Sequence, residues 1–389
     1  MVETDRLWSM VAAAGGIAPA ERRVVVDEPV ELPDGEPDRW QHGYKLRGVM
    51  TDCRGIDDTA APGALRPGTL RLRDADGPLA DGIDYLVDEH WAALTRKRPL
   101  RSAVAEYEYS LLRVDVLLAD GRILRGQSHL SNPQPPGIPD DSETLATIFV
   151  PYAGDEPVLI PVTNVPRTPL SAPQSDCLPA VRKAIGEGRP VRITCWGDSV
   201  TAGGSASSKR TAYPSQLLDL LHTAGIAAEV RTVAIGGSQS QEWLSDGGSP
   251  NGADWRKVAA TEPDLITLEF VNDAELDPSR WPSLYGEILA RCRAAGADLL
   301  LLEPHFTRPD WMHIDRIDAA DPRPYVAFLR AFAARESVAL AAVSDRWHRL
   351  YAEGVAYPTL LRNGINHPDD RGHRIYAEEA AAVLGVQPS

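Results

Sequence analysis

The sequence has little of what would place it in a membrane or on a nucleic acid. No apolar stretch approaches the roughly 20 residues that are needed to span a bilayer. Lys and Arg number 40 against 55 Asp and Glu, which gives a formal net charge of −15, and no basic run offsets this excess. We therefore expect neither a nucleic acid nor a membrane as a partner.

Cysteine is also scarce, with Cys53, Cys177, Cys195 and Cys292 making four in 389 residues. Their spacing matches no disulfide framework, so we expect free thiols in a reducing compartment. The acidic amino terminus, residues 1–5, lacks the basic and then apolar layout of a signal peptide. These features together predict a soluble, cytoplasmic protein.

Length and pattern predict two domains. Residues 1–163 contain short alternating runs, such as 112–118, separated by turn signals such as Asp120-Gly121. This pattern is typical of a β sandwich or jelly roll with almost no helix. Residues 164–177 are rich in Pro, Ser and Thr, and we predict an inter-domain linker there. The second domain then covers residues 178–389.

The second domain alternates strands with helices. Short β-branched and apolar runs predict strands at 191–196, 229–235, 264–271, 297–302 and 338–343. Apolar residues recur at helical spacing between them, as at Tyr213, Leu217 and Leu221. Strands joined by crossover helices predict an α/β fold of the flavodoxin-like kind, with a parallel five-stranded sheet between two helical layers.

Four candidate catalytic residues lie near the ends of these elements. Ser199 follows the first strand in a Gly-Asp-Ser turn, Gly237 follows the second, Asn272 follows the third, and His367 precedes the last helix. The carboxyl ends of parallel strands share one edge of the sheet, so the first three can converge there. A late loop can bring His367 to the same edge. This set favours nucleophilic catalysis by the serine.

The order and spacing of these residues resemble the four motif blocks of the SGNH (GDSL-type) hydrolase/esterase family, over roughly residues 190–385. The resemblance implies that Ser199 is the nucleophile and that His367 is the general base. It also implies an oxyanion hole made by the backbone N–H groups of Ser199 and Gly237 and by the Asn272 amide. Ester hydrolysis needs such groups, because a hydroxyl must lose its proton and negative charge must be met by fixed donors.

The chain departs from the family pattern at several positions. Gly364 stands where the family normally places Asp, three residues before the catalytic His, and Val271 stands where Gly usually precedes the Asn. Thr232 replaces the Asn that usually opens the second block. We therefore predict a Ser-His dyad, whose base titrates near the ordinary histidine pKa of about 6.5.

A displaced third member is the alternative to the dyad. The carboxylates that could take this role are Glu269, Glu303, Asp369 and Asp370.

Several of these residues also have simpler interpretations. Asn272 and Asp273 could cap the next helix, because both residue types are favoured at helix starts. His373 is predicted to be structural. Trp196, next to the Gly-Asp-Ser turn, belongs either to the core or to the wall of an acyl pocket. No group of residues has the ligand spacing of a metal site.

Together these features predict a serine esterase that works through an acyl-enzyme and uses neither a metal nor an organic cofactor. In the resembled family, a β-rich domain ahead of the hydrolase domain is common in carbohydrate esterases that remove acetyl groups. By that analogy we expect a short-chain, acetyl ester of a carbohydrate or small molecule as the substrate. A lipid or acyl-thioester hydrolase and a non-catalytic glycan-binding protein are the alternatives. The sequence leaves open whether the protein forms a homo-oligomer.

Overall fold

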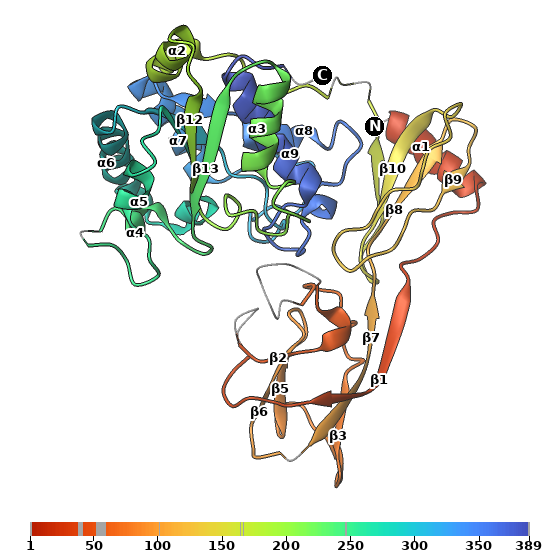
Figure 1. Cartoon of the computed structure of the whole chain (residues 1–389). Coiled ribbons are helices and arrows are strands. Elements are labelled where there is room, and N and C mark those ends of the chain that lie inside the picture. Colours follow the sequence, from red (N-terminus) through yellow and green to blue (C-terminus); the bar gives the residue numbers. More distant parts are fainter. Residues whose placement is uncertain are drawn as a thin grey trace. The chain divides into compact units, whose positions relative to one another are not determined.

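The computed structural model describes residues 2–37, 42–51, 60–100, 102–163, 165, 167–245 and 247–387. Cys53 lies outside these residues. The chain divides into two compact units (Figure 1). The β unit comprises residues 1–165 and 351–366, and the α/β unit comprises residues 166–350 and 367–389. The sequence did not indicate that a late segment returns to the first unit.

The α/β unit contains one parallel sheet at the predicted positions. Its strands are β12 (Val191–Gly197), β13 (Ala228–Ala234), β14 (Leu265–Glu269), β15 (Asp298–Leu302) and β16 (Ala339–Ala341). Their order is β13-β12-β14-β15-β16, and all four neighbouring pairs are parallel. The strand order therefore reverses between β12 and β14, which is where open sheets of this type bind ligands.

Helices cover both faces of this sheet, so the predicted three-layer α/β fold is confirmed (Figure 1). The helices are α2 (Pro179–Gly186), α3 (Tyr213–Thr223), α4 (Ser240–Trp243), α5 (Trp255–Ala259), α6 (Trp281–Ala294), α7 (Pro324–Glu336), α8 (Val343–Arg349) and α9 (Asp370–Val383). Short 3-10 turns are η2 (Ser175–Cys177), η3 (Val271–Glu275) and η4 (Pro278–Arg280). α3 packs on α9, whereas α6 and α7 share a core with alternate residues of β12, β14 and β15.

Trp196 belongs to that core. It is fully buried, and its ring centroid lies 5.3 Å from that of Trp255, 5.4 Å from that of Phe270 and 6.0 Å from that of Trp243. Since successive residues of a strand point to opposite faces, the side chain of Cys195 points to the α3 side instead. The first of the two interpretations of Trp196, a core residue, is therefore the correct one.

The β unit is built from antiparallel strands, which confirms its predicted β-rich character. Its sheets have the orders β1-β7-β3-β4, β11-β10-β8-β9 and β2-β6-β5. The elements are β1 (Arg22–Val30), β2 (Tyr44–Lys45), β3 (Arg71–Asp74), β4 (Gly77–Leu79), β5 (Tyr85–Asp88), β6 (Ala93–Arg96), β7 (Ala103–Ser110), β8 (Arg113–Leu118), β9 (Ile123–Leu124), β10 (Thr144–Val150) and β11 (Val158–Pro161), with η1 (Arg47–Val49) and η5 (Tyr357–Leu360).

A helix, α1 (Val2–Ala13), begins the β unit, where almost no helix was expected. Leu7 and Val11 lie one turn apart and are buried against Leu117 and Ile148 of the second sheet. Such a short apolar repeat is a weak helical signal in the sequence. The apolar face of the sheet, which the sequence alone does not locate, provides the partner for this helix.

The Pro-rich stretch that was predicted as a linker is bonded to the α/β unit from residue 170 onward. The N–H groups of Leu170 and Ser171 donate to the Glu379 carboxylate of α9, at 2.9 and 2.8 Å. Gln174 Nε2 donates to the carbonyl of Leu340 at 2.7 Å. This part of the stretch therefore extends the packed unit.

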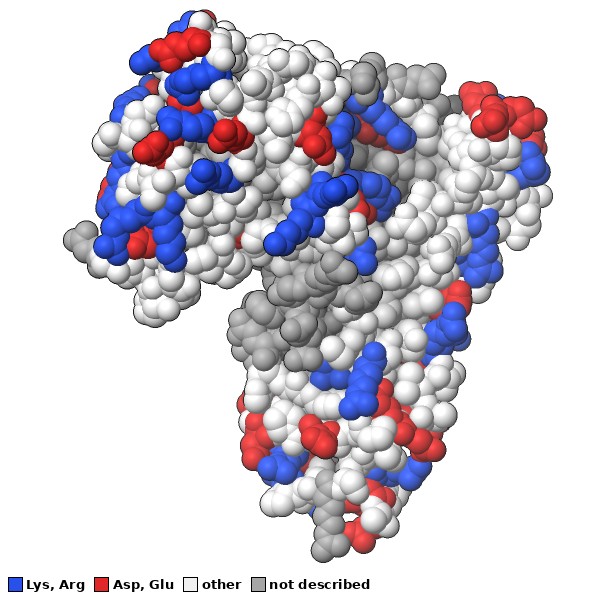
Figure 2. Space-filling view, viewed as in Figure 1, with Lys and Arg blue, Asp and Glu red and all other residues white. Residues whose placement is uncertain are grey.

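Acidic and basic side chains are interspersed on the face shown in Figure 2. Over the part of the chain that the structure describes, no helix is long and apolar enough to cross a bilayer. The same residues contain no group of three or more His, Cys, Asp or Glu that could hold a metal ion. Cys177, Cys195 and Cys292 are free thiols.

Candidate active site

The turn that carries Ser199 begins where β12 ends. Asp198 donates its N–H to the Glu269 carbonyl of the neighbouring strand (3.2 Å), and its Oδ1 accepts the N–H of Val200 (3.0 Å). The N–H of Gly204 then bonds back to the Ser199 carbonyl at 2.7 Å. These bonds close the backbone into a tight turn and leave Ser199 half-buried at the edge of the sheet.

The structure brings Ser199 and His367 together. Ser199 Oγ lies 2.8 Å from Nε2 of His367, although the two residues are 168 positions apart. His367 lies just before α9, whose first turn is capped by Asp369, because its carboxylate accepts two backbone N–H groups. The nucleophile and base that the sequence predicted are thus within hydrogen-bond reach, as this chemistry requires.

Burial changes the acid–base behaviour of His367. The residue is only 2% exposed, and burial, together with the charge of His373, lowers its pKa to about 4. The expectation of a pKa near 6.5 is therefore wrong, since it assumed a solvated ring. At neutral pH the imidazole is uncharged, so one ring nitrogen can accept a proton.

Gly204 lies against the imidazole of His367, and the predictions did not include this contact. A Cβ atom at Gly204 would come within 3.2 Å of Cε1 and Nδ1 of His367 and within 2.8 Å of the Ser199 carbonyl. The Gly204 carbonyl is bonded to Nε2 of His373 at 3.1 Å. His373, which was expected to be structural, therefore holds the loop that contacts His367. The Gly-Gly pair at 203–204 was the signal that could have indicated this close approach.

The turn after β13 lies beside Ser199. A Cβ atom at Gly236 would lie 3.6 Å from Cβ of Ser199, and Gly237 has a φ of +74°, in the left-handed region that favours glycine. Asn272 Nδ2 donates to the Ser238 carbonyl at 3.2 Å. This bond uses one of the two N–H groups of the amide. The oxyanion roles of Gly237 and Asn272 stay predictions.

Asp273 anchors α4 rather than capping the turn in which it lies. Its carboxylate accepts the N–H and the Oγ–H of Ser240, at 2.9 and 2.6 Å, and the hydroxyl of Tyr285 at 2.9 Å. Burial raises the pKa of Asp273 to about 6. The capping interpretation of this pair is therefore wrong for Asp273, because its partners come from other elements.

Two buried carboxyl groups, Asp198 and Glu269, support the turn that carries Ser199. Asp198 Oδ2 accepts the N–H of Asn272 (3.3 Å), and Glu269 Oε2 accepts the hydroxyl of Thr201 (3.0 Å). Burial raises the pKa of Asp198 to about 7 and the pKa of Glu269 well above its usual range. The negative charge of Asp198 raises the pKa of Glu269 further. Both groups hold backbone and side chains around Ser199.

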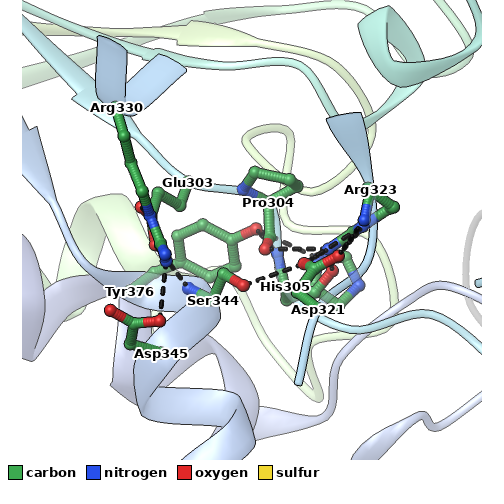
Figure 3. Close-up of polar contacts among 9 residues, drawn as sticks. All are labelled: Glu303, Pro304, His305, Asp321, Arg323, Arg330, Ser344, Asp345 and Tyr376. Carbon is green, nitrogen blue, oxygen red and sulfur yellow. Dashed lines mark hydrogen bonds and ion pairs between the residues drawn. The ribbon is translucent and has the colours of Figure 1, made fainter. Parts of the chain in front are cut away.

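Glu303 belongs to a separate polar network at the ends of β15 and β16 (Figure 3). Its carboxylate accepts Nε of Arg330 at 2.6 Å and the N–H of Ser344 at 3.2 Å. Arg330 also bonds to Asp345 at 2.7 Å. Glu303 therefore pairs with the charged Arg330 side chain and accepts a backbone N–H group in the first turn of α8.

The last two candidate carboxylates are engaged near α9. Asp369 accepts Nε of Arg371 at 2.8 Å besides capping the helix. Asp370 accepts the N–H and the Oγ–H of Ser207, at 2.7 and 2.5 Å. All four carboxylates considered as a third member thus bind other groups, and the dyad stays a prediction.

Residues 195–375 match the model of the family described as GDSL-like Lipase/Acylhydrolase. The predicted resemblance to this family is therefore confirmed over these residues, and with it the coarse class, a GDSL-like hydrolase domain. The matched residues include Ser199, Gly237, Asn272 and His367. No curated protein sequence matches the chain.

Solved structures to which the chain is similar, all at low identity, include the following three. One is a two-domain esterase active on acetylated mannans, with 17% identity, a TM-score of 0.44 and 56% of each chain covered. Another is TesA, with 22% identity, a TM-score of 0.38 and coverage of 50% of this chain and 97% of that chain. The third is a catalytic mutant of an acetylxylan esterase from Geobacillus stearothermophilus, with 15% identity, a TM-score of 0.40 and coverage of 50% and 94%. The chain thus spans little more than half of the two-domain esterase.

Proposed function

We propose that this protein is a serine esterase that hydrolyses short-chain esters, with Ser199 as nucleophile and His367 as general base. The observation that carries the proposal is the 2.8 Å separation of Ser199 Oγ and His367 Nε2 at the carboxyl edge of the sheet. A serine hydroxyl is a weak nucleophile until a base takes its proton. An uncharged imidazole at this distance can do so.

The reaction proceeds in two halves. In the first, Oγ of Ser199 bonds to the ester carbonyl carbon while its proton passes to Nε2 of His367. The tetrahedral intermediate then collapses, the C–O bond to the alcohol breaks, and His367 returns the proton to the leaving alkoxide. In the second half, water loses a proton to His367 and attacks the acyl-enzyme. The acid leaves and Ser199 regains its proton.

The oxyanion is stabilised by donors around Ser199 in this proposal. The backbone N–H groups of Ser199 and Gly237 and the second N–H of the Asn272 amide are assigned this role. Asp198 supports the assignment, because its carboxylate accepts the backbone N–H of Asn272 and so restrains that residue. Donors held in place before the reaction cost no reorganisation as charge develops, and losing one costs about 10²–10³ in rate.

We assign an acetyl or similarly short acyl group, on a carbohydrate or a small molecule. Val271, which is almost fully buried, replaces the glycine that usually precedes the Asn, and its bulk reduces the room beside Asn272. The apolar crevice lined by Val181, Val191 and Ile193 involves the amino end of β12, opposite to Ser199, so it is no acyl site for this serine. The β-rich unit ahead of the GDSL-like domain favours a carbohydrate ester by analogy alone.

Reactivity of Ser199 separates this proposal from a non-catalytic glycan-binding protein. We expect a fluorophosphonate probe to label Ser199 in the wild-type protein, and Ser199→Ala to abolish both labelling and hydrolysis of p-nitrophenyl acetate. The Ser110→Ala variant, which removes another buried hydroxyl, is the control for folding and should label normally. Residual hydrolysis above a tenth of wild type in Ser199→Ala would rule out this nucleophile.

A panel of p-nitrophenyl esters of increasing acyl length, together with acetylated oligosaccharides, tests the substrate class. The proposal expects kcat/KM to be highest for acetyl and to fall with chain length. A maximum at long acyl chains or at an acyl thioester would instead support a lipid or thioester hydrolase.

A further inference from the structure

The start of α9 is fixed within the α/β unit, directly after the proposed base. His367 lies three residues before the helix, and Asp369 caps the helix by accepting two backbone N–H groups. A Cβ atom at Gly372 would lie 2.5 Å from Cβ of Pro368 and 2.9 Å from Cζ2 of Trp347 in α8. The first turn of α9 therefore packs directly on α8, and only glycine leaves room for this approach.

Two side chains of α9 hold the loop between β12 and α3, which carries Ser199. The carboxylate of Asp370 accepts the N–H and the Oγ–H of Ser207, at 2.7 and 2.5 Å. Nε2 of His373, one turn further along the helix, lies 3.1 Å from the carbonyl oxygen of Gly204. The loop is therefore bonded to α9 at two nearby points.

The bond from His373 has a defined direction. A carbonyl oxygen only accepts hydrogen bonds, so Nε2 of His373 carries the hydrogen. The ring is fully buried, and this burial lowers its pKa, so the ring is uncharged at neutral pH and Nδ1 carries no hydrogen. Nδ1 has no hydrogen-bond partner among the residues that the structure describes, which leaves the bond to Gly204 as the only one of this ring in that part of the chain.

Gly204 links this bond to both proposed catalytic residues. Its N–H donates to the carbonyl of Ser199 at 2.7 Å, and a Cβ atom there would lie 3.2 Å from Cε1 and Nδ1 of His367. Its φ is not in the left-handed region, so the close contacts, and not the backbone conformation, require glycine here. A closed circuit therefore runs from Ser199 through Gly204 and α9 to His367, and the 2.8 Å contact between the two catalytic groups completes it.

We propose that Asp370 and His373 are positioning residues that fix the spacing between Ser199 and His367. The proposal rests on the function proposed above for these two groups. One helix continues the backbone of His367 and bonds the loop of Ser199, so the loss of either bond lets the nucleophile shift relative to the base. The bond from the buried His373 ring restrains the loop more than the exposed bond from Asp370, because water competes less for a buried bond.

The size of the expected effect follows from the geometry of catalysis. Displacing a catalytic group by about 1 Å can cost about 10² in rate, although binding of substrate is untouched. A residue that only stabilised the fold would, when replaced, lower the melting temperature and leave the turnover of folded molecules unchanged. The two possibilities therefore differ in kcat.

The first test compares His373→Leu with His373→Gln in the full-length protein. Leu removes the donor, whereas Gln keeps an amide N–H at a similar distance from the backbone. We expect His373→Leu to lower kcat for p-nitrophenyl acetate about 10- to 100-fold with little change in KM, and His373→Gln to stay within about fivefold of wild type. Rescue by Gln is not expected of a residue that only fills space.

Glu379→Gln is the control on the same helix. Glu379 is buried further along α9, and its carboxylate accepts the N–H groups of Leu170 and Ser171 instead of a group in the loop of Ser199. We expect this variant to lower the melting temperature and to keep the wild-type kcat. A loss of kcat like that of His373→Leu would contradict the proposal, because kcat would then follow the general stability of α9.

Asp370 gives a second, independent pair of variants. Asp370→Ala removes both acceptor oxygens from Ser207, whereas Asp370→Asn keeps one. Both variants remove the charge at the start of α9, so the effect of that charge on the helix cancels in the comparison. We expect kcat to fall about tenfold in Asp370→Ala and to stay near wild type in Asp370→Asn. If His373→Leu does not fold, this pair decides.

Two further measurements do not depend on activity. The ring nitrogen chemical shifts of His373 should place the hydrogen on Nε2 in wild type, and hydrogen exchange at residues 203–208 should be faster in His373→Leu than in His373→Gln. A hydrogen on Nδ1 instead, or wild-type kcat in folded His373→Leu and Asp370→Ala, would overturn the proposal. If the wild-type protein neither hydrolyses esters nor labels at Ser199, the proposed function fails, and these two measurements still decide whether α9 holds the loop.

Discussion

His367 combines a short contact with Ser199 Oγ and a ring that has almost no access to water. Burial disfavours the imidazolium form, so His367 stays unprotonated at pH values where an exposed histidine would already be charged. The same burial makes the ring a weaker base. The Gly204 backbone and His373 lie beside the ring and contribute to this closed environment.

This environment predicts that activity persists to an unusually low pH. The acid limb of kcat/KM reports the pKa of the base in the free enzyme, so we expect it near the pKa of about 4 that burial gives His367. Activity on p-nitrophenyl acetate should therefore persist at pH 5. The measurement is kcat/KM from pH 3.5 to 8, with circular dichroism at each pH to confirm folding. A limb near 6.5 would show that the ring is solvated in solution.

At the scale of elements, carboxylates stand at the ends of three neighbouring strands, but each has a different partner. Asp198 after β12 binds backbone N–H groups, Glu269 at the end of β14 binds Thr201, and Glu303 after β15 binds Arg330. The parallel sheet places their backbones at one edge, and the helices that follow decide which groups each side chain meets. The position of a carboxylate at a strand end therefore indicates where it lies in the sheet but does not indicate which group it binds.

The dyad predicts that no single carboxylate is essential as a third member. We expect Glu269→Gln, Glu303→Gln, Asp369→Asn and Asp370→Asn each to keep kcat within about tenfold of wild type, whereas the Asp of a full triad is worth up to about 10⁴. The measurement is kcat for each amide variant beside His367→Ala. One variant that loses as much as His367→Ala while staying folded would identify a displaced third member.

At the scale of the whole molecule, the buried acids that support the Ser199 turn make stability depend on pH. Burial raises the pKa of Glu269 above its value in the unfolded chain, so the folded state binds its proton more tightly. Its contribution is fully present below the unfolded pKa of about 4.3 and is lost as the pH rises. His367, with a lowered pKa, acts in the opposite direction and favours the folded state above about pH 6.5.

Glu269→Gln isolates the first of these effects, because the amide does not titrate. The free energy of unfolding of the variant, relative to wild type, should rise between pH 5 and pH 7, by at most about 1.4 kcal/mol per pH unit. Urea unfolding at pH 5, 6 and 7 provides the measurement, and Ser110→Ala, which removes no ionisable group, is the control. A relative stability that is flat or falls with pH would mean that Glu269 is ionised in the fold.

Local patterns were enough to predict the α/β unit. Short β-branched and apolar runs located β12 to β16, and the residues that follow three of these strands indicated Ser199, Gly237 and Asn272, because strand ends in a parallel sheet share an edge. The pattern failed for α1, whose apolar face is short and is stabilised by a sheet distant in sequence. It also failed for the pKa of His367, which depends on burial.

The sequence by itself determined the fold class, which follows from periodicity and chain connectivity, and it showed the four motif blocks whose order resembles the SGNH (GDSL-type) family. Only the tertiary structure decided how those residues are held. Packing put Gly204 beside His367, bonded His373 to the Gly204 carbonyl, engaged the other candidate carboxylates elsewhere, and returned Tyr351–Asn366 to the β unit. These are contacts between residues far apart along the chain, and they depend on close packing in three dimensions, which no local pattern encodes.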